Sequence, residues 1–206
     1  MKNTIKYLIL LIIYLVCGVN LQAQNYTFRN VVMSDGLSGL LVNAIYKDSE
    51  GFVWLGTDNC LDRFDGVKVR HYEFRGVDSG RKKRVNCITE TADNQLWVGN
   101  GIGLWRLNRA NGQLERIVPE KIDFAVNTLL PDGDILYIGT EKGLFIQKDG
   151  QLLQVLTDRN MLAACNRIMD LCLNEDKSAL WLATVQGLFS YSLKDGKIDS
   201  WHFQEN

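Results

Sequence analysis

The sequence has little proline, little histidine and no excess of charge of either sign. Only two prolines accompany 18 glycines and 10% aromatic residues, a composition that suits an ordered, turn-rich β protein and excludes a disordered chain. The 23 lysines and arginines are balanced by 24 aspartates and glutamates. This balance excludes a nucleic-acid surface, or a funnel for acidic substrates, spread over the whole domain.

Recognisable catalytic and metal-binding patterns are also missing. The only histidines are His71 and His202, on expected outer strands three repeats apart, and no nucleophile elbow, zinc-ligand spacing or glycine-rich phosphate loop is present. The cysteines that follow residue 24 have no metal-like spacing, and those at 87 and 172 are interpreted as small core residues without a disulfide. These four are Cys60, Cys87, Cys165 and Cys172. We therefore expect no enzyme, no cofactor and no metal site.

The one long apolar run lies at the N-terminus and is typical of an export signal. Residues 8–16 are uninterrupted apolar side chains behind two lysines, and polar residues follow before the ~20 apolar residues that a membrane span needs. Residues 1–24 are therefore predicted to be a signal peptide, and residues 25–206 the exported, periplasmic part. The alternatives are an uncleaved membrane anchor and a lipoprotein attached at Cys17.

A short motif, an aromatic residue followed by an apolar residue and then glycine (alanine in the fourth copy), recurs through the rest of the chain. Its first copy is Trp54-Leu55-Gly56-Thr57, and the aromatic position returns roughly every 42 residues. The later copies begin at Trp97, Tyr137 and Trp181. Each copy is followed by a turn signal of Asp or Asn and Gly, at Asp65-Gly66, Asn111-Gly112, Asp149-Gly150 and Asp195-Gly196. Such a period, holding four short strands, is typical of one blade of a β-propeller.

We therefore predict an all-β fold of about four four-stranded antiparallel propeller blades. One blade cannot bury both of its faces, so neighbouring blades must stack, with the repeated Trp or Tyr in the core between them. The blades are expected over residues 37–76, 85–120, 126–157 and 166–204, and an additional outer strand over residues 26–33. In the first blade the strands are expected at 42–47, 52–57, 60–64 and 67–74.

The residues around the first motif are similar to a known repeat. Gly36-Leu37-Ser38, with residues 51–57 and 61–66, closely resembles the two-component regulator propeller repeat of the periplasmic sensor region of hybrid two-component histidine kinases. Cys60 departs from that repeat, which usually has glycine there. The resemblance implies a seven-bladed ring, of which this chain supplies only a part.

The remaining blades, or a second propeller domain, are then expected partners. A missing C-terminal part would provide the only link to the membrane, and the full-length parent would be a histidine kinase and a candidate dimer. The favoured function is the N-terminal part of a periplasmic sensor domain that recognises oligosaccharides for signal transduction. The alternative is a free-standing exported propeller that serves as a protein-interaction scaffold, and a propeller lyase or glycosidase is a third class.

Two groups of polar residues are candidate ligands for a sugar chain. The first is the basic run between the first two blades, which suits sulfate or carboxylate groups but also an ordinary solvated loop. It comprises Arg81, Lys82, Lys83 and Arg84. The second is the repeated asparagine near the start of each inner strand, facing the central channel, which suits sugar hydroxyls or backbone groups at the strand start. It comprises Asn43, Asn86 and Asn127.

Three further side chains are predicted to stabilise the fold and not to bind a ligand. Trp105 takes the repeat position that Asp62 occupies in the first blade and phenylalanine in the last two, so it is expected to pack. Arg63 and Arg106 share one repeat position and are expected to make local ion pairs.

Overall fold

The computed structural model describes residues 4–7, 30–77, 83–117, 122–156 and 167–200. Two compact units are distinguished, Met1–Val31 and Val32–Asn206. In the first unit only a short helical stretch at 4–7 and residues 30–31 are described, so the predicted signal peptide lies almost entirely outside the described residues. None of the helices in the described part of the chain is long and apolar enough to span a membrane.

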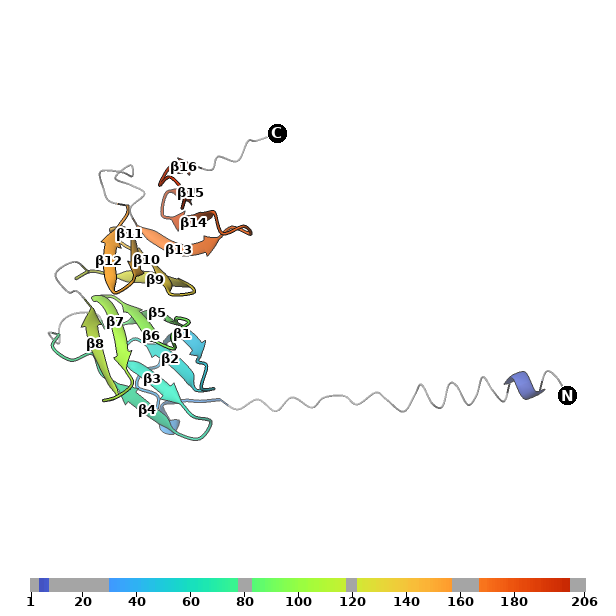
Figure 1. Cartoon of the computed structure of the whole chain (residues 1–206). Helices are drawn as coiled ribbons and strands as arrows, with labels where there is room; N and C mark the ends of the chain where they lie inside the picture. The colour runs from blue at the N-terminus through green and yellow to red at the C-terminus, as the bar shows by residue number, and fades with distance from the viewer. Residues whose placement is uncertain (1–3, 8–29, 78–82, 118–121, 157–166, 201–206) are drawn as a thin grey trace. The chain divides into compact units, whose positions relative to one another are not determined.

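The second unit is built from four antiparallel sheets of four strands each, and in every sheet the strands follow one another in chain order (Figure 1). The first sheet holds β1 (Val42–Lys47), β2 (Val53–Thr57), β3 (Leu61–Phe64) and β4 (Val69–Tyr72). The second holds β5 (Val85–Glu90), β6 (Leu96–Asn100), β7 (Gly103–Asn108) and β8 (Gln113–Ile117). The third holds β9 (Val126–Asp132), β10 (Ile135–Thr140), β11 (Gly143–Lys148) and β12 (Gln151–Gln154). The fourth holds β13 (Ile168–Leu173), β14 (Ala179–Thr184), β15 (Gly187–Ser192) and β16 (Ile198–Ser200).

The prediction of four-stranded antiparallel blades is confirmed. Strand β1 has the predicted bounds, whereas β4 is two residues shorter at each end than the expected 67–74. The extra outer strand expected over residues 26–33 is not formed in its described part. Met33–Asp35 is instead a 3-10 helix that ends at Gly36, with φ 103°, because the Asp-Gly pair favours a turn.

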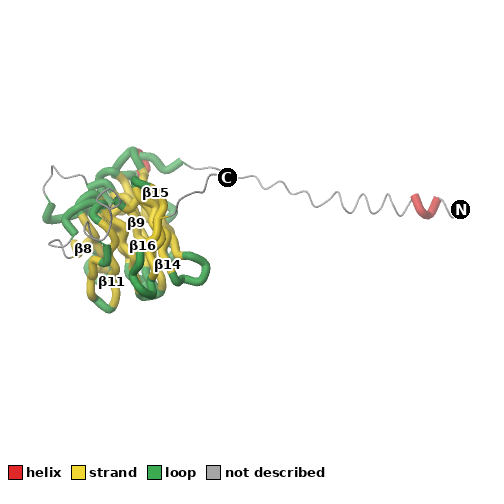
Figure 2. The backbone as a smooth tube through the Cα atoms, turned by 90° about the horizontal axis from the view of Figure 1, so that it is seen from above, coloured by secondary structure: helices red, strands yellow, loops and turns green. Residues whose placement is uncertain are grey.

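The blades stack through their inner strands, with β1 beside β5, β5 beside β9 and β9 beside β13. The glycine of the repeated motif makes this approach possible. A Cβ atom on Gly56, Gly99 or Gly139 would lie 2.4 Å, 2.6 Å or 2.8 Å from the first residue of the next inner strand, which is Val85, Val126 or Ile168. A strand glycine often marks such a close backbone approach. In the view of Figure 2 the strands lie together, and loops project at their ends.

The repeated aromatic residue fills the space between a blade and the one that follows. Trp54, Trp97 and Tyr137 are buried, as predicted, and each packs in a cluster with residues of the next blade. Trp181 is only half-buried, so the prediction that all four are buried is wrong at this position. The reason is that no further blade among the described residues packs against β14.

Several side-chain predictions can be compared with the structure. Trp105 is 1% exposed and its ring lies 5.0 Å from that of Phe74, which confirms the packing role. Arg106 pairs with Glu115 at 3.3 Å, whereas Arg63 has no ion pair within the described part of the chain and lies over the ring of Phe52.

The two cysteines interpreted as core residues differ. Cys87 lies against the second blade's glycine, with partial burial of the whole residue, but Cys172 is exposed, so its core assignment is wrong. Cys172 is the register partner of Trp181, and both lie on the side of blade four that no described blade covers. Cys165 lies outside the described residues.

Candidate functional site

A β-bulge near the start of each inner strand positions the repeated asparagine. The register of the inner pair shifts by one residue in all four blades. The residues left without a register partner are Asn43, Asn86, Asn127 and, in the fourth blade, Met169. A bulge redirects the side chain of its extra residue, and bulges are frequent next to functional sites. The sequence pattern located the asparagines but contained no signal that identified the bulges.

The four bulged residues line one cleft of about 480 Å³. Its other lining residues come from the loops around the same end of the inner strands: Arg84, Gly101, Ala125, Glu141 and Arg167. The cleft therefore brings together all three predicted asparagines and one residue of the basic run. Arg167 and Glu141 were not singled out in the sequence, since neither belongs to a repeated pattern.

Two of the asparagines link neighbouring blades. The Nδ2 atom of Asn86 donates a hydrogen bond of 2.8 Å to the carbonyl oxygen of Val126, and Nδ2 of Asn127 donates one of 2.8 Å to that of Ile168. Each bond connects adjacent inner strands and satisfies a backbone acceptor. These two amides therefore bind backbone groups, which is the role that the sequence offered as the alternative to sugar binding.

The asparagine of the first blade differs from its equivalents. Nδ2 of Asn43 is buried and has no hydrogen-bond partner among the described residues. An unsatisfied buried donor costs ~1–3 kcal/mol, so a ligand oxygen that accepts from this amide would recover free energy.

The charged groups of the cleft are exposed. Arg84 and Arg167 are both exposed, and among the described residues neither guanidinium takes part in an ion pair. Glu141 accepts a hydrogen bond of 3.4 Å from the backbone nitrogen of Ala125. Guanidinium groups bind carboxylate and sulfate through paired donors, while amides and carboxylates bind hydroxyls. The cleft therefore combines anion-binding and hydroxyl-binding groups.

The remaining residues of the basic run are only partly described. Arg81 and Lys82 lie outside the described residues, and Lys83 is half-buried just before β5. Arg84 is held by its backbone, since its carbonyl oxygen accepts a hydrogen bond of 3.1 Å from Gly101. This bond ties the end of the basic run to the cleft.

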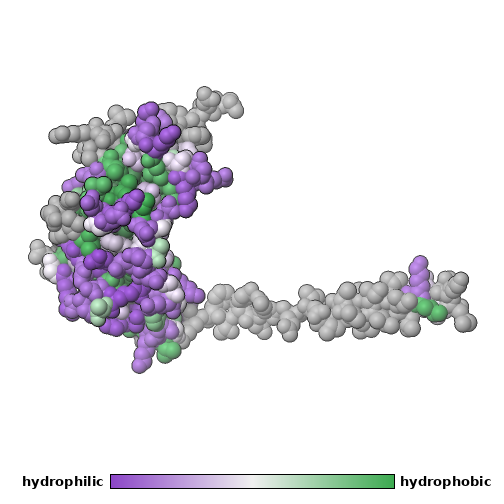
Figure 3. Space-filling model, viewed as in Figure 1, coloured by the Kyte–Doolittle hydropathy of each residue, from purple (hydrophilic) through white to green (hydrophobic). Residues whose placement is uncertain are grey.

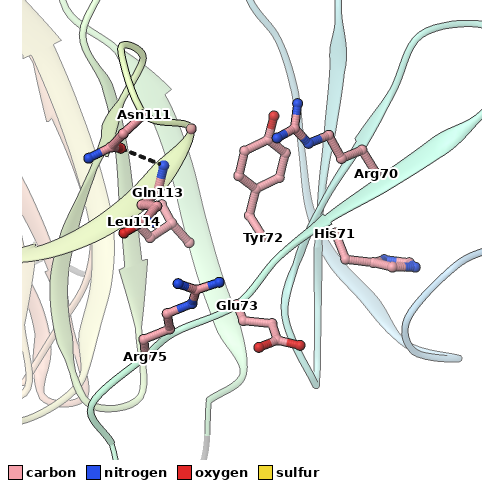
Figure 4. A pocket seen from close by; sticks show the side chains of 9 residues that line it. Arg70, His71, Tyr72, Glu73, Arg75, Asn111, Gln113 and Leu114 are labelled. Carbon is pink, nitrogen blue, oxygen red and sulfur yellow. Dashed lines mark hydrogen bonds between the residues drawn. The ribbon is translucent and has the colours of Figure 1, made fainter.

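A second cleft, of about 320 Å³, lies at the outer strands of the first two blades. Figure 4 shows Tyr72 and Arg75 on the side of the Asn111–Gln113 turn, whereas His71 points away from it. The guanidinium of Arg70 lies 5.1 Å from the centre of the Tyr72 ring. No repeated residue marks this cleft, and sequence reasoning did not predict it.

The sheets, their chain order and their stacking through inner strands define a β-propeller architecture. Residues 36–59 match the model of the family described as "Two component regulator propeller". This match covers the turn before β1, the strands β1 and β2, and the turn that follows β2. The first blade therefore carries a two-component regulator propeller repeat, as its residues predicted.

Similar proteins are found among extracellular sensor domains. The extracellular domain of the hybrid two-component system BT3049 from B. thetaiotaomicron is 21% identical with a TM-score of 0.72, over 87% of this chain and 27% of that chain. The corresponding domain of BT4673 from B. thetaiotaomicron is 26% identical with a TM-score of 0.63, over 77% of this chain and 22% of that chain. Histidine kinase P4 of Formosa agariphila is 32% identical over 79 residues, which are 38% of this chain and 6% of that protein.

The chain thus spans less than a third of the length of each of these relatives. Together with the family match, the similarities establish homology to extracellular sensor domains of hybrid two-component systems.

Proposed function

We propose that this chain is the N-terminal part of a periplasmic sensor propeller that binds an oligosaccharide and carries out no catalysis itself. Its homology to extracellular sensor domains supports the sensor role. Transmission of the signal then depends on further blades and on a kinase that belong to the full-length parent.

The observation that carries the proposal is the cleft at the inner-strand bulges. Asn43 offers a buried amide donor without a partner, and the two arginines offer guanidinium groups without an ion pair among the described residues. Glu141 adds an acceptor beside them. This combination fits a sugar chain whose hydroxyls bind Asn43 and Glu141 and whose carboxylate or sulfate binds Arg84 and Arg167. An anionic oligosaccharide is therefore the proposed ligand class.

The basic run extends this site. Arg84 lies in the cleft, and Lys83 precedes it directly in the chain. We assign Arg81, Lys82 and Lys83 to further, weaker contacts with the anionic groups of a longer sugar chain. Such contacts between exposed charges weaken as salt screens them.

The test compares affinities for anionic and neutral oligosaccharides by calorimetry. Exchanging both cleft arginines, Arg84→Ala with Arg167→Ala, should lower the affinity for anionic chains at least about 100-fold, because charge-assisted hydrogen bonds contribute ~1.5–3 kcal/mol each. The matched control is Arg70→Ala with Arg75→Ala in the outer cleft, which should leave the affinity unchanged. Equal losses in both double variants would contradict the assignment of the cleft.

A second comparison separates ligand binding from blade linkage. Asn43→Ala should lower the affinity about 10-fold and leave the unfolding midpoint unchanged, because its Nδ2 atom has no hydrogen-bond partner among the described residues. Asn86→Ala should instead lower the unfolding midpoint, because it removes the bond to Val126. An unchanged affinity of Asn43→Ala for every oligosaccharide that binds would reject the proposed role of this amide.

The alternative function, a protein-interaction scaffold, is favoured by one observation. Leu40, Leu41 and Ile45 at the first inner strand are 82%, 63% and 72% exposed, and contiguous exposed apolar groups often mark interaction surfaces. If the scaffold function holds, Leu40→Ser with Ile45→Ser will abolish self-association or partner binding in sedimentation experiments and no oligosaccharide will bind. The sensor function predicts the opposite result for oligosaccharides.

A further inference from the structure

The first blade differs from the other three at one buried position. Asp62 pairs with Leu55 in the same register in which Trp105 pairs with Val98, and phenylalanines take this place in the last two blades. Asp62 is 0% exposed. The second and third blades thus bury an aromatic ring, and the fourth partly buries one, where the first blade buries a carboxylate. Burying an ionised group is costly unless other groups compensate it, so the surroundings of Asp62 require an explanation.

Two metal-binding side chains lie beside this carboxylate. Cys60 precedes Asp62 by two residues, and His71 on β4 is the register partner of Asp62. Oδ1 of Asp62 lies 3.3 Å from the Sγ atom of Cys60 and 2.7 Å from the Nδ1 atom of His71. The three ligand atoms all lie within 4.8 Å of one another. Pairing of β3 with β4 therefore assembles a thiol, a carboxylate and an imidazole at one point.

A fourth residue fixes the orientation of the carboxylate. Both the backbone nitrogen and the Oγ atom of Ser38 donate hydrogen bonds of 2.8 Å to Oδ2 of Asp62. The same hydroxyl lies 2.9 Å from Oγ1 of Thr57. Oδ2 is thus fully engaged, and Oδ1 is directed towards Cys60 and His71. Metal-binding carboxylates are commonly oriented by hydrogen bonds of this kind.

The arrangement does not suit a cysteine nucleophile. In catalytic triads the imidazole lies between the nucleophile and the carboxylate, whereas here the carboxylate lies between the thiol and the imidazole. Burial, together with the neighbouring Asp62, raises the pKa of the Cys60 thiol to about 12. A nucleophilic cysteine needs a lowered pKa.

We propose that Cys60, Asp62 and His71 form a Zn²⁺ site with a fourth coordination position open to water or another ligand. Thiolate, carboxylate and imidazole are the three donor types that zinc prefers. Bond lengths of ~2.0–2.3 Å in a tetrahedral centre separate neighbouring ligand atoms by roughly 3.4–3.6 Å. The sulfur–oxygen distance of 3.3 Å is close to this value. The nitrogen–oxygen distance must widen, and the His71 side chain, 47% exposed, has the freedom to move outward.

Metal binding changes the protonation of the site. The thiol gives up its proton to the solvent, and His71 binds as a neutral ring with its proton on Nε2, so that the Nδ1 lone pair faces the metal. His71 also provides the entry path, because it is the exposed member of the three ligands. His71 also lines the outer cleft, although Figure 4 shows its ring pointing away from the Asn111–Gln113 turn. None of the three proposed ligands lines the inner cleft.

The test is titration of the full chain with zinc chloride by calorimetry, and with Co²⁺ as a spectroscopic substitute. We expect one metal ion per chain and a cobalt spectrum with sulfur-to-metal charge transfer and the strong d–d bands of a tetrahedral centre. Cys60→Ser and His71→Gln should each weaken zinc binding at least 100-fold. Ser38→Ala should weaken it 10- to 100-fold, as expected for a group that orients a ligand.

The matched controls change a different cysteine and the second histidine of the chain. Cys172→Ser and His202→Gln should leave zinc affinity and stoichiometry unchanged. A cobalt spectrum without sulfur charge transfer, or full zinc affinity in Cys60→Ser, would overturn the proposal. Because His71 is exposed, His71→Gln is expected to fold, and unchanged zinc binding by this variant would overturn the proposal even if Cys60→Ser failed to fold.

Discussion

Blades two and four contain nearly the same motif but bury it to different extents. All five residues of β6 are buried, whereas in β14 buried residues alternate with half-buried ones. The third blade covers one side of the second blade, with Trp97 packed beside Val126, and no described blade does so for the fourth. The repeat therefore specifies a blade, while the neighbouring blade determines how much stability each motif residue contributes.

The surfaces show the same contrast. In the view of Figure 3 the first two blades present mainly hydrophilic side chains, while hydrophobic side chains appear around the third and fourth.

The interface between the first and second blades also has a group of polar contacts, which we call the polar clamp. Glu90 accepts hydrogen bonds from Arg109 and Ser49, and Arg109 reaches Glu50 at 3.1 Å. At the last interface the ion pair found among the described residues is the exposed one of Lys177 with Asp132 at 2.6 Å, and Oγ1 of Thr128 donates a hydrogen bond of 3.0 Å to Oδ1 of Asp170.

Removing the motif tryptophan should give the largest difference between the two blades. Trp97→Ala is expected to cost ~3–5 kcal/mol, because it empties a buried space between blades two and three. Trp181→Ala should cost less than about half of that, because its ring is only half-buried. Denaturant unfolding measures both free energies. Equal losses would mean that the flank of blade four is covered in solution.

Changes at the motif glycine should give the next largest difference. In Gly99→Ala the new methyl group would lie 2.5 Å from Sγ of Cys87 and 2.6 Å from Cγ1 of Val126, so the second and third blades must separate. Such overpacking costs ~1–3 kcal/mol. The reciprocal change in blade four, Ala183→Gly, should cost under ~1 kcal/mol, because only the intrinsic strand preference is lost. A Gly99→Ala variant with the unfolding midpoint of the unmodified chain would refute the close-approach explanation.

The polar clamp between the first two blades should contribute less. Arg109→Ala is expected to cost about 1–2 kcal/mol, because it leaves the buried Glu90 carboxylate without its cation. Lys177→Ala should cost under ~0.5 kcal/mol, since the Lys177 side chain is 63% exposed. Unfolding at low and high salt provides the measurement. The proposed clamp would be contradicted if high salt removed the effect of Arg109→Ala completely.

The smallest expected effect is the lowered pKa of the aspartate in the closing turn, and it should be found in both the first and the last blade. Hydrogen bonds from the backbone of Lys68 and Val67 lower the pKa of Asp65, and hydrogen bonds from Ser192 and Lys197 lower that of Asp195. Since the folded pKa lies below the unfolded value, each contribution to stability is present above the unfolded pKa and is lost as pH falls through the folded pKa. NMR titration should find both pKa values lowered. An ordinary pKa in blade four alone would mean that its turn is not formed.

Much of this architecture could be predicted from residues that act locally. The strands of the first blade are recognisable because alternating apolar and β-branched residues favour a pleated surface, and the Asp-Gly pairs favour turns. The repeat spacing then predicts stacking, since a lone blade cannot bury its faces. The sequence did not predict that the asparagines and Arg84 line one cleft, and at the candidate site only their identity as two separate groups was accessible. Their division into two bonded amides and one unpaired amide was not, because it depends on distances between blades.

Sequence by itself determined the four blades, their strand order and the turns that close them, because these follow from local preferences and from the period of the motif. Tertiary structure alone decided that Asn43 lacks the bond its equivalents make and that Trp181 is half-buried. It also decided that Cys60, Asp62 and His71 meet. The physical reason is that hydrogen bonding, burial and metal coordination depend on a few ångströms between strands, and pairing register and blade stacking set those distances.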